Sequence, residues 1–321
     1  MDPPRARLMA RRALGPATLA IVQAVDALDA PPAGWVVACS GGADSLALAW
    51  AAHHVAGRRG LGVRALVVDH GLQEASAAVA RTVVETLAGF GLDAAAVRVT
   101  VPDTGAGPEA SAREARYAAL TTAAGEGERI LLGHTLDDQA ETVLLGLARG
   151  AGLRSLAGMP VTRGVLDRPL LGLGREVTAS ACDELGLTPW ADPMNADHRY
   201  ARVRVREVVL PTLERELGPR IREALARTAS RLRETHDLIS ELAEETEPDL
   251  VPDCLHLLGL APGLRRRVVR DWLSATGATD VASVHVDAVE RLVTHWRGQK
   301  GIDVPGGRVS RRDGRLVFEV R

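Results

Sequence analysis

The sequence predicts an α/β protein with a doubly wound, mainly parallel sheet, followed by a smaller, mainly helical C-terminal domain. Short apolar runs typical of buried strands alternate with longer stretches whose apolar residues recur at helical spacing. A Gly-rich hexapeptide follows one strand, and a dense polar cluster follows another. Because the carboxyl ends of parallel strands deliver their next residues to one crevice, we expect these segments to share a ligand site.

The N-terminal half justifies this fold element by element. A helix is expected over 16–30, and the pair Pro31-Pro32 ends it. The first strand, over 35–39, leads through the hexapeptide into a helix. Further strands are expected over 63–69, 94–101 and 129–133, alternating with helices over 75–90, 109–124 and 136–149.

The second half is more helical. We expect a Gly-rich loop over 150–164 and an irregular stretch over 190–200. The pattern places the domain boundary near Gly218, which gives domains 1–217 and 218–321. Helices are expected over 175–187, from 202 onward, and over 220–245, 264–273 and 284–296, with a small hairpin or meander within 301–321.

The composition excludes several classes of protein. The 321 residues are 46% hydrophobic and 25% charged, and the formal net charge of −2 shows no global basic signature for nucleic acid. The three cysteines include no CxxC pair, which argues against a zinc site, an iron–sulfur cluster or a disulfide framework. No apolar run reaches the length of a membrane span and no leader pattern follows the basic N-terminus, so we expect a cytoplasmic protein without a membrane partner.

The hexapeptide is a candidate phosphate site. A Gly-rich turn between a strand and a helix leaves free N–H groups at a helix N-terminus, where the helix dipole also favours anions. Glycine allows close approach of a ligand, and a carboxylate here suits Mg²⁺ or a ligand hydroxyl. It is neither a Walker loop nor GxGxxG, and for a bare Ser-Gly-Gly a capped tight turn is an equal alternative. Its residues are Ser40, Gly41, Gly42, Ala43, Asp44 and Ser45.

Two later stretches add polar chemistry. Residues 133–142 (GHTLDDQAET) lie at a strand-to-helix junction, where Asp137 and Asp138 would also suit the helix dipole as purely structural residues. Between Arg199 and Arg233 there are ten arginines against four glutamates. Such a run is usually a solvated helix face, but its single sign and its position after the candidate site favour an RNA-facing role.

The hexapeptide resembles the pyrophosphate loop of the N-type ATP pyrophosphatases, and residues 133–159 resemble the signature of tRNA(Ile)-lysidine synthetases. The similarity continues in order from about 37 to 213 and departs from the family pattern at Thr135, Gly146, Ser155 and Val203. The chain is similar to the short form of this family. The remaining matching segments are VDHGL at 68–72, E-x-x-A-R-x-x-R-Y at 109–117, RPLL at 168–171, Asp192-Pro193-x-Asn195, and Arg202, Arg204 and Arg206 before Pro211.

This resemblance implies an ATP-dependent ligase of a specific RNA. ATP adenylates the wobble cytidine of the CAU-anticodon isoleucine tRNA with release of pyrophosphate, and free L-lysine then displaces AMP from C2. Lysidine forms, and decoding switches from AUG to AUA. ATP is the co-substrate and Mg²⁺ the expected cation, and the resemblance leaves room for a homodimer.

The resemblance also implies roles for particular residues. Ser40 to Ser45 would hold ATP, with Asp44 assigned either to Mg²⁺ or to ATP positioning. Lysine must lose a proton because its unperturbed pKa is about 10.4, and Asp137 is expected to bind its ammonium group, with Glu141 as a helper. His134 would stabilise the phosphoryl transition state or contact the nucleotide. Phosphate and tRNA contacts are expected from Arg113, Arg202, Arg204, Arg206, Arg227 and Arg231.

Three alternatives remain open at this point. A tRNA thiolation enzyme uses the same loop but usually needs paired reactive cysteines or a cluster. Amide-forming synthetases, such as those that make NAD or GMP, lack the 133–159 block and the basic stretch. A non-catalytic ATP-sensing or RNA-binding protein would keep the loop as a relic, which the intact Asp44, His134 and Asp137 argue against.

Overall fold

The computed structural model describes residues 13–69, 71, 76–101, 108–246 and 252–320, without the side chains of 108–110 and 195. The chain forms two compact units, residues 1–149 with 158–229 and residues 150–157 with 230–321. The sequence placed a boundary between 217 and 218, ahead of helix α11 (Ile221–Glu245), whereas these units divide within α11.

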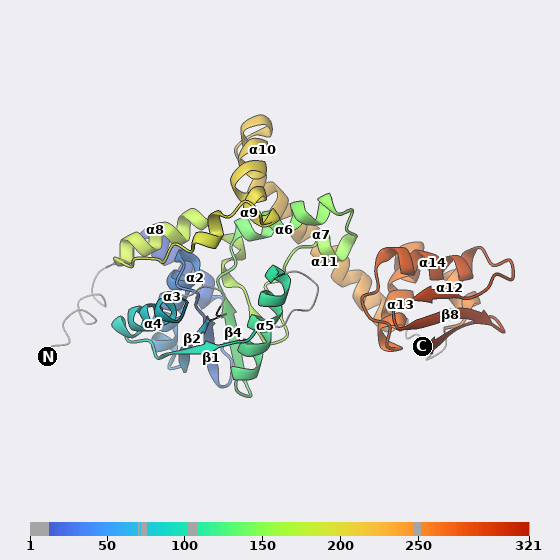
Figure 1. Ribbon diagram of the computed structural model, residues 1–321, viewed down its shortest axis with the longest axis horizontal. Helices are drawn as coiled ribbons and strands as arrows, with labels where there is room; N and C mark the ends of the chain where they lie inside the picture. Colours follow the sequence, from blue (N-terminus) through green and yellow to red (C-terminus); the bar gives the residue numbers. More distant parts are fainter. Residues whose placement is uncertain (1–12, 70, 72–75, 102–107, 247–251, 321) are drawn as a thin grey trace. The chain divides into compact units, whose positions relative to one another are not determined.

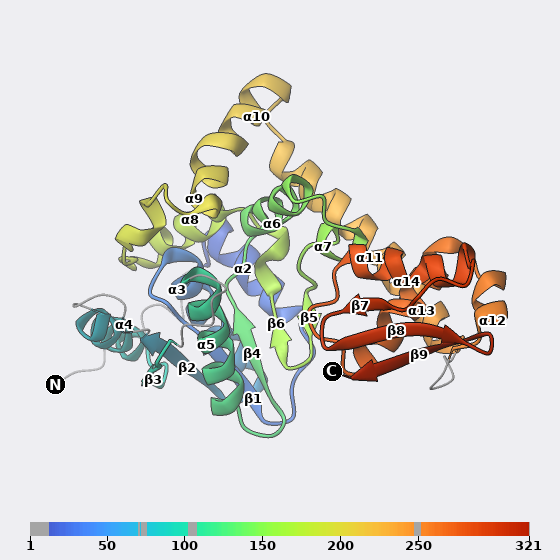
Figure 2. The same cartoon turned by 45° about the vertical axis from the view of Figure 1, so that its right-hand side comes forward.

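A six-stranded sheet forms the centre of the first unit (Figure 1), and its strand order is β3-β2-β1-β4-β6-β5 (Figure 2). The pairs β1–β2, β1–β4, β2–β3 and β4–β6 are parallel, and only the edge pair β5–β6 is antiparallel. The predicted α/β class with a mainly parallel sheet is confirmed. The strands are β1 (Gly34–Ala38), β2 (Val63–Asp69), β3 (Ala94–Arg98), β4 (Glu128–Leu132), β5 (Thr162–Arg163) and β6 (Leu166–Asp167).

Alternating side chains of the strands divide the core between the two faces of the sheet. Val37 belongs to the cluster that packs against helices α2, α3, α4 and α8, whereas its neighbour Val36 packs with Leu120 and Tyr117 of α5. Coverage on both faces explains why the central strands are continuously apolar instead of alternating. The helices are α2 (Pro16–Asp26), α3 (Ala43–Arg59), α4 (Ser76–Gly89), α5 (Pro108–Ala123), α6 (Leu136–Ala148) and α8 (Arg175–Leu185).

The Gly-rich segment differs from the prediction of an irregular loop. It contains a short helix, α7 (Leu153–Leu156), and strand β5, which pairs with β6 and extends the sheet beyond β4 (Figure 2). Two-residue strands carry too few side chains for a period of two to be recognisable, so the sequence pattern missed them. A 3₁₀ turn over Pro169–Gly172 then leads into α8.

The helical run after residue 200 is continuous but changes its winding. Helix α9 (Ala201–Arg204) passes through a π-helical segment, Val205–Val209, into α10 (Leu210–Leu217). Pro211 has no N–H for the carbonyl of Glu207 four residues earlier, and a widened turn just before the proline accommodates that loss. A π-helical segment changes which residues face the rest of the protein, so it affects the direction in which the Arg206 side chain points.

The second unit combines helices with a small antiparallel sheet, as predicted. Helices α13 (Pro262–Ala275) and α14 (Ser283–Thr294) pack over the sheet β7-β8-β9, with Trp272 and Val289 in the shared core. The turn between β8 and β9 places Asp313 and Gly314 at positive φ, as a two-residue hairpin requires. The sequence pattern missed helix α12 (Cys254–Gly259). The strands are β7 (Ile302–Val304), β8 (Gly307–Arg312) and β9 (Arg315–Val320).

Candidate active site

The predicted phosphate loop connects β1 to α3, and its backbone opens toward the helix N-terminus. Gly42 is the N-cap residue of α3 and has extended backbone angles. The Ser45 hydroxyl accepts a 3.1 Å hydrogen bond from the Ser40 N–H and donates one of 3.0 Å to the Gly42 carbonyl. Ser45 therefore braces the loop from inside, while Ser40 is exposed at its rim.

Two glycines allow the close approach of segments around this loop. Gly41 has φ +87°, and a Cβ there would lie 2.4 Å from Cγ2 of Val83. Gly133, at the end of β4, lies against the other side, since its Cβ would be 3.1 Å from the carbonyl carbon of Asp44. The loops after β1 and β4 are thus in contact, as the expected crevice requires.

Asp44 projects from the first turn of α3 toward α8. Its Oδ2 lies 3.3 Å from Nε of Arg175, and its Oδ1 accepts a hydrogen bond from the Thr178 hydroxyl. Burial raises the pKa of Asp44, and the hydrogen bond from Thr178 and the charge of Arg175 counteract that rise. Asp44 is therefore a carboxylate with fixed orientation beside the phosphate loop.

Asp138 caps the next helix and also meets Arg175. Its Oδ2 accepts hydrogen bonds from the backbone N–H of Thr135 at 2.9 Å and from the Thr135 hydroxyl at 3.1 Å. Its Oδ1 lies 3.0 Å from Nη2 of Arg175. Burial alone would raise the pKa of Asp138, but Arg175 and the Thr135 N–H hold it below the usual value. Asp138 therefore serves the local structure of α6 and the charge cluster together.

Glu141 lies one turn further along α6, and its side chain has no exposed surface. Arg206 binds it through two nitrogens, with Nε 2.6 Å from Oε1 and Nη2 3.2 Å from Oε2. Nε of Arg202 lies 3.6 Å from Oε2, and Nη1 of Arg175 lies 3.7 Å from Oε1. Burial raises the pKa of Glu141 even against these arginines.

Asp137 occupies the outer edge of the same cluster, with 13% of its side chain exposed. Its Oδ2 accepts a 2.8 Å hydrogen bond from the backbone N–H of Arg175, and its Oδ1 lies 3.1 Å from Nε of Arg222 in α11. Arg222 is shared with Glu214 of α10. The carboxylate therefore has one backbone partner and one side-chain cation that a ligand ammonium group could replace.

His134 is partly buried, and the charges of Asp138 and of three arginines act on it. Burial lowers the pKa of His134 to about 3, and Arg116, Arg113 and Arg168 act in the same direction while Asp138 opposes them. Its Nδ1 is buried without a hydrogen-bond partner among the described residues. At neutral pH the imidazole is uncharged, so it can bind a nucleotide by a hydrogen bond but brings no positive charge of its own.

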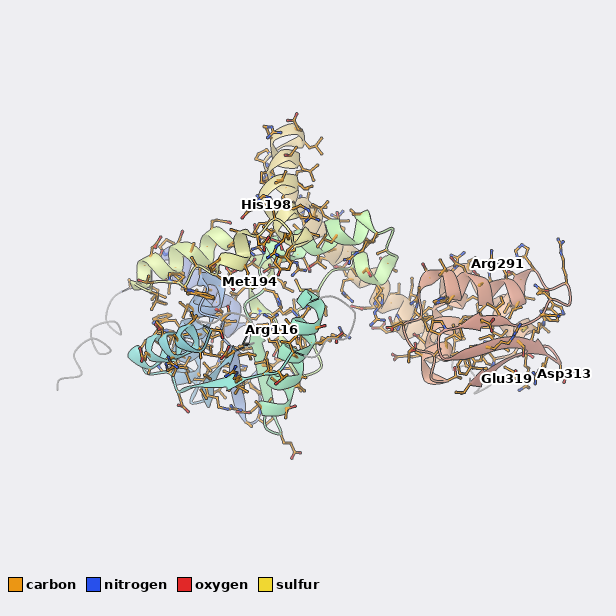
Figure 3. All side chains as sticks on the ribbon, in the orientation of Figure 1. Arg116, Met194, His198, Arg291, Asp313 and Glu319 are labelled. Carbon is orange, nitrogen blue, oxygen red and sulfur yellow. The ribbon has the colours of Figure 1, made fainter. Side chains whose placement is uncertain are left out.

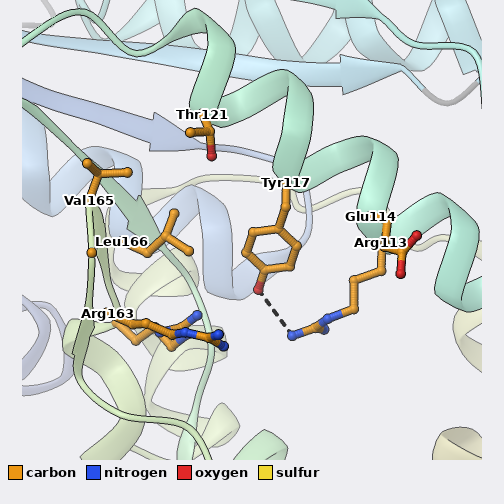
Figure 4. Close-up of a pocket in the computed structure, with 9 residues that line it drawn as sticks. Arg113, Glu114, Tyr117, Thr121, Arg163, Val165 and Leu166 are labelled. Carbon is orange, nitrogen blue, oxygen red and sulfur yellow. Dashed lines mark hydrogen bonds between the residues drawn. The ribbon is translucent and has the colours of Figure 1, made fainter. Parts of the chain in front are cut away.

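Arg113 lines a separate pocket (Figure 4). Its Nη2 lies 3.1 Å from the Tyr117 hydroxyl, and its guanidinium carbon lies 5.0 Å from the centre of the Tyr117 ring. Helix α5 supplies both side chains. The β5–β6 hairpin, absent from the predicted fold, supplies the opposite wall through Arg163 and Leu166.

The structure does not bring every predicted residue into this site. Arg204 donates from Nη1 to the carbonyls of Arg199 and His198 and has no ion pair with the carboxylate cluster among the described residues. His198 is labelled in Figure 3. Arg202 and Arg206 are four residues apart and share a face, whereas Arg204 lies between them on the opposite face.

Arg227 and Arg231 are exposed on α11. Of the predicted segment after β2, Asp69 is buried and accepts a hydrogen bond from the Gly71 N–H, while His70 lies outside the described residues.

Sequence reasoning missed the residue that joins the cluster. Arg175 contacts Asp44, Asp138 and Glu141 from the first turn of α8. A cation in the first turn of a helix opposes the helix dipole, so its presence there was a signal that other charges compensate it. Arg222 carried no such signal, because it lies in a stretch where many arginines look equivalent.

The protein by itself offers few side chains that could coordinate a metal ion. Among the described residues, no three His, Cys, Asp or Glu side chains lie close enough together to hold one. Mg²⁺ in nucleotide sites is commonly held by one or two carboxylates, with the substrate phosphates as further ligands. Asp44 fits that arrangement, since its partly exposed carboxylate adjoins the phosphate loop.

The cysteines are unsuited to sulfur chemistry. Cys39, Cys182 and Cys254 are all buried. Burial raises the pKa of Cys39 and Cys254 and raises that of Cys182 to about 11, so all three thiols stay protonated at neutral pH. This argues against the thiolation alternative.

Among the described helices, none combines the length and the hydrophobicity that a membrane span requires.

Comparison with known proteins agrees with the geometry. A family model described as a PP-loop domain matches residues 18–213, and one described as a TilS substrate binding domain matches residues 253–317. Among solved structures, the U34-tRNA thiolase NcsA from Methanococcus maripaludis covers 68% of this chain and 78% of its own, with a TM-score of 0.57 and 17% identity. At that identity the likeness shows the fold alone.

Curated relatives are much closer. The tRNA(Ile)-lysidine synthase of Salinispora arenicola is 52% identical over 95% of this chain and 97% of its own length. Those of Thermobifida fusca and Cutibacterium acnes are 48% and 46% identical, over 89% and 98% of this chain and 92% and 100% of their own lengths. The PP-loop match assigns ATP binding to the domain over residues 18–213. The chain therefore belongs to the tRNA(Ile)-lysidine synthase family.

Proposed function

We propose that this protein ligates free L-lysine to C2 of the wobble cytidine of the CAU-anticodon isoleucine tRNA, forming lysidine at the expense of ATP. The observation that carries the proposal is the arrangement of Asp137, Asp138 and Glu141 on α6, one loop away from the phosphate-binding hexapeptide. An adenylating loop beside an acidic subsite suits a reaction that joins an activated base to a cationic amine.

ATP is assigned to the loop from Ser40 to Ser45. The N–H groups at the start of α3, together with the helix dipole, would hold the phosphates, with Gly41 and Gly42 keeping the approach open. Asp44 would hold Mg²⁺, which would neutralise charge on the departing pyrophosphate. Arg175 orients Asp44 for that task.

Lysine is assigned to Asp137. Its side chain is the most exposed of the three α6 carboxylates, and its present side-chain cation, Arg222, occupies the position that an ammonium group would take. The same carboxylate would accept the proton that the amine must lose before it attacks C2. Glu141 lies deeper and holds Arg206 and Arg175 in place, so it would support the subsite without contacting the proton.

The cytidine is assigned to the space between His134 and Arg113. Neutral His134 would bind the nucleotide by a hydrogen bond, and Arg113 would stabilise the negative charge that develops during adenylation. The cytidine lies in an anticodon loop, so it can turn outward without opening a duplex.

The remaining arginines are assigned to the tRNA. Arg227 and Arg231 would contact the backbone from the exposed face of α11, and Arg204 from the surface near α9. Arg202 and Arg206 stay with Glu141 and would act on the substrate side of the cluster. We place the reaction in the cytoplasm, and a homodimer stays a prediction that analytical ultracentrifugation would check.

The test is mass analysis of a CAU-anticodon isoleucine tRNA transcript after incubation with the protein, ATP, Mg²⁺ and lysine. A lysine-dependent mass gain at the wobble cytidine is the expected result. The variant Asp137→Asn should lose most of the ligation and raise the KM for lysine while keeping ATP-to-pyrophosphate turnover on the tRNA. Asp183→Asn, an exposed site on α8, is the matched control. Near-normal ligation and lysine affinity in Asp137→Asn would contradict the role of Asp137 in binding lysine and accepting its proton.

A further inference from the structure

A basic pocket includes Arg113, but the ligands assigned above do not account for its other two arginines, Arg163 and Arg168. Its volume is about 780 Å³, and it lies between α5 and the β5–β6 hairpin. Figure 4 shows Tyr117 and Arg113 reaching into it from α5, with Arg163 on the opposite wall. Its lining residues are Arg113, Glu114, Tyr117, Thr121, Arg163, Gly164, Val165, Leu166 and Arg168.

The positive charges around this pocket are not neutralised by the protein. Among the described residues, no carboxylate forms an ion pair with Arg113, Arg116 or Arg168, although Glu114 is part of the lining. Arg168 is only 4% exposed. It donates from Nη1 to the Pro160 carbonyl at 3.1 Å, but its Nε is buried without a partner, as is Nε of Arg116. A buried Nε–H group without a partner is costly, and a bound anion that accepts a hydrogen bond from it would remove that cost.

The pKa of Tyr117 reflects the same excess of positive charge. Burial alone would raise the pKa of its hydroxyl, but Arg113, Arg168 and Arg116 together hold that pKa below its usual value. Both Arg113 and Arg116 also lie over its ring, at 5.0 and 5.6 Å from the ring centre. The Tyr117 hydroxyl is a hydrogen-bond partner of Arg113 Nη2 and of Arg168, so the tyrosine holds both arginines in position at the pocket.

The planar guanidinium group of arginine matches the oxygens of a phosphate group. Three arginines, Arg113, Arg163 and Arg168, line this pocket, and together they select for such an anion. The phosphates of ATP already have the hexapeptide loop. Arg163 of the pocket lining is exposed, so the pocket is open to solvent there and an RNA strand can reach it. We infer that this pocket binds a backbone phosphodiester of the anticodon loop next to the modified cytidine. The inference rests on the proposed function for the identity of the RNA.

The test measures binding of a CAU anticodon stem-loop RNA by fluorescence anisotropy, without lysine or ATP, at several salt concentrations. Arg163→Ala removes an exposed side chain and should leave the fold intact. We expect its RNA affinity to fall about 5- to 10-fold and the slope of log K against log salt to flatten by about 0.7, the value for one lost contact to single-stranded RNA. The matched control is Arg81→Ala, an exposed arginine of α4 without an ion pair among the described residues.

A second experiment identifies the phosphate. Single uncharged methylphosphonate linkages are placed at each position of the loop, and each RNA is bound to the wild type and to Arg163→Ala. One position next to the cytidine should weaken binding to the wild type and have no further effect in the variant. RNA affinity and salt slope unchanged in Arg163→Ala would overturn the inference. A raised KM for ATP with unchanged RNA affinity would also overturn it and assign the pocket to triphosphate.

These results are separable from those of the ligation assay, because no reaction is needed to measure RNA binding. A wild-type protein that binds the stem-loop through Arg163 but adds no lysine would refute the proposed function and retain the phosphate site. If the Arg163→Ala variant ligates lysine normally and keeps its RNA affinity, the proposed function is retained and the phosphate site is refuted.

Discussion

Nη2 of Arg175 donates a 3.0 Å hydrogen bond to Oδ1 of Asp138, and the same guanidinium approaches Asp44 at 3.3 Å and Glu141 at 3.7 Å. Three carboxylates from two different helices therefore share one arginine from a third. Without it, like charges would face one another in a partly buried space, where their repulsion is stronger than in water. Arg175 thus couples the phosphate loop to the acidic subsite on α6.

Replacing Arg175 with alanine should destabilise the protein and abolish most of its activity. We expect the free energy of unfolding to fall by about 3 kcal/mol, because breaking one partner of a buried charge cluster leaves the others uncompensated. Urea denaturation followed by circular dichroism measures this. Arg175→Lys should recover part of the stability but little activity, because an ammonium group cannot reach three carboxylates in a planar fork. A stability loss no larger than that of the exposed-site control Arg58→Ala would contradict the coupling role.

The pair Glu141–Arg206 should show a coupling energy of about 2 kcal/mol in a double-mutant cycle with Glu141→Gln and Arg206→Ala. The pH dependence gives a sharper check. Burial raises the native pKa of Glu141 above its usual 4.5, so the native state binds the proton more tightly than the unfolded chain does. The stability contribution of that protonation is present at low pH and is lost as pH rises through the native pKa. Arg206→Ala should therefore destabilise the protein less at pH 5 than at pH 7, and an equal cost at both values would contradict this.

His134 should remain neutral well into the acidic range. Its native pKa is about 3 against 6.5 in the unfolded chain, so between these values the unfolded state binds a proton that the native state does not. Stability should decrease as pH falls through this window. His134→Gln should make stability between pH 7 and 5 less dependent on pH. In the wild type, the imidazole resonance should not titrate above pH 4 by NMR, and a midpoint near 6.5 would contradict the burial argument.

Gly41 and Gly42 form a matched pair with different expected effects. Gly41→Ala should lower the melting temperature, because φ +87° is strained for alanine and its Cβ would clash with Val83. Gly42→Ala should fold normally, since a Cβ there meets nothing nearer than Ser40 Oγ at 3.8 Å. The new methyl group would stand in the phosphate cradle, so the stabilisation of Gly42→Ala by ATP in a thermal shift assay should shrink. Full ATP stabilisation of Gly42→Ala would place the phosphates elsewhere.

Reversing the charges of Arg227 and Arg231 should weaken tRNA binding and leave ATP binding intact. Both side chains are exposed on α11, and two lost phosphate contacts should flatten the salt dependence of binding by about 1.5 to 2. Filter binding of the full tRNA and a thermal shift with ATP measure the two effects separately. Reversal at exposed Arg58 is the control, and equal losses of tRNA and ATP binding in the double variant would indicate misfolding instead.

Much of the fold was predictable because each signal is local. The Val63–Asp69 strand was predicted with the bounds it has, since a buried parallel strand is a continuous apolar run with clear ends. Strands β5 and β6 were missed because two residues carry no recognisable period. Pro211 was visible in the sequence, but the π-helical segment it accompanies depends on how α9 and α10 pack around Leu210 and Ala140.

The site divides in the same way. The sequence was enough to single out the hexapeptide 40–45 and the carboxylates of α6 as candidate site residues, because Gly41, Asp44 and Asp137 belong to short contiguous motifs whose chemistry depends on local backbone geometry. Which arginine contacts which carboxylate is visible only in the folded chain. Arg175 and Arg222 lie far along the chain from Asp44 and Asp137. The place of Arg175 in a first helical turn indicates that some charge compensates it but not which one, and no local pattern distinguishes Arg222 from arginines that face solvent. Charge pairing between distant segments is decided by where packing of the apolar core brings the helices, and that information is spread over the whole chain.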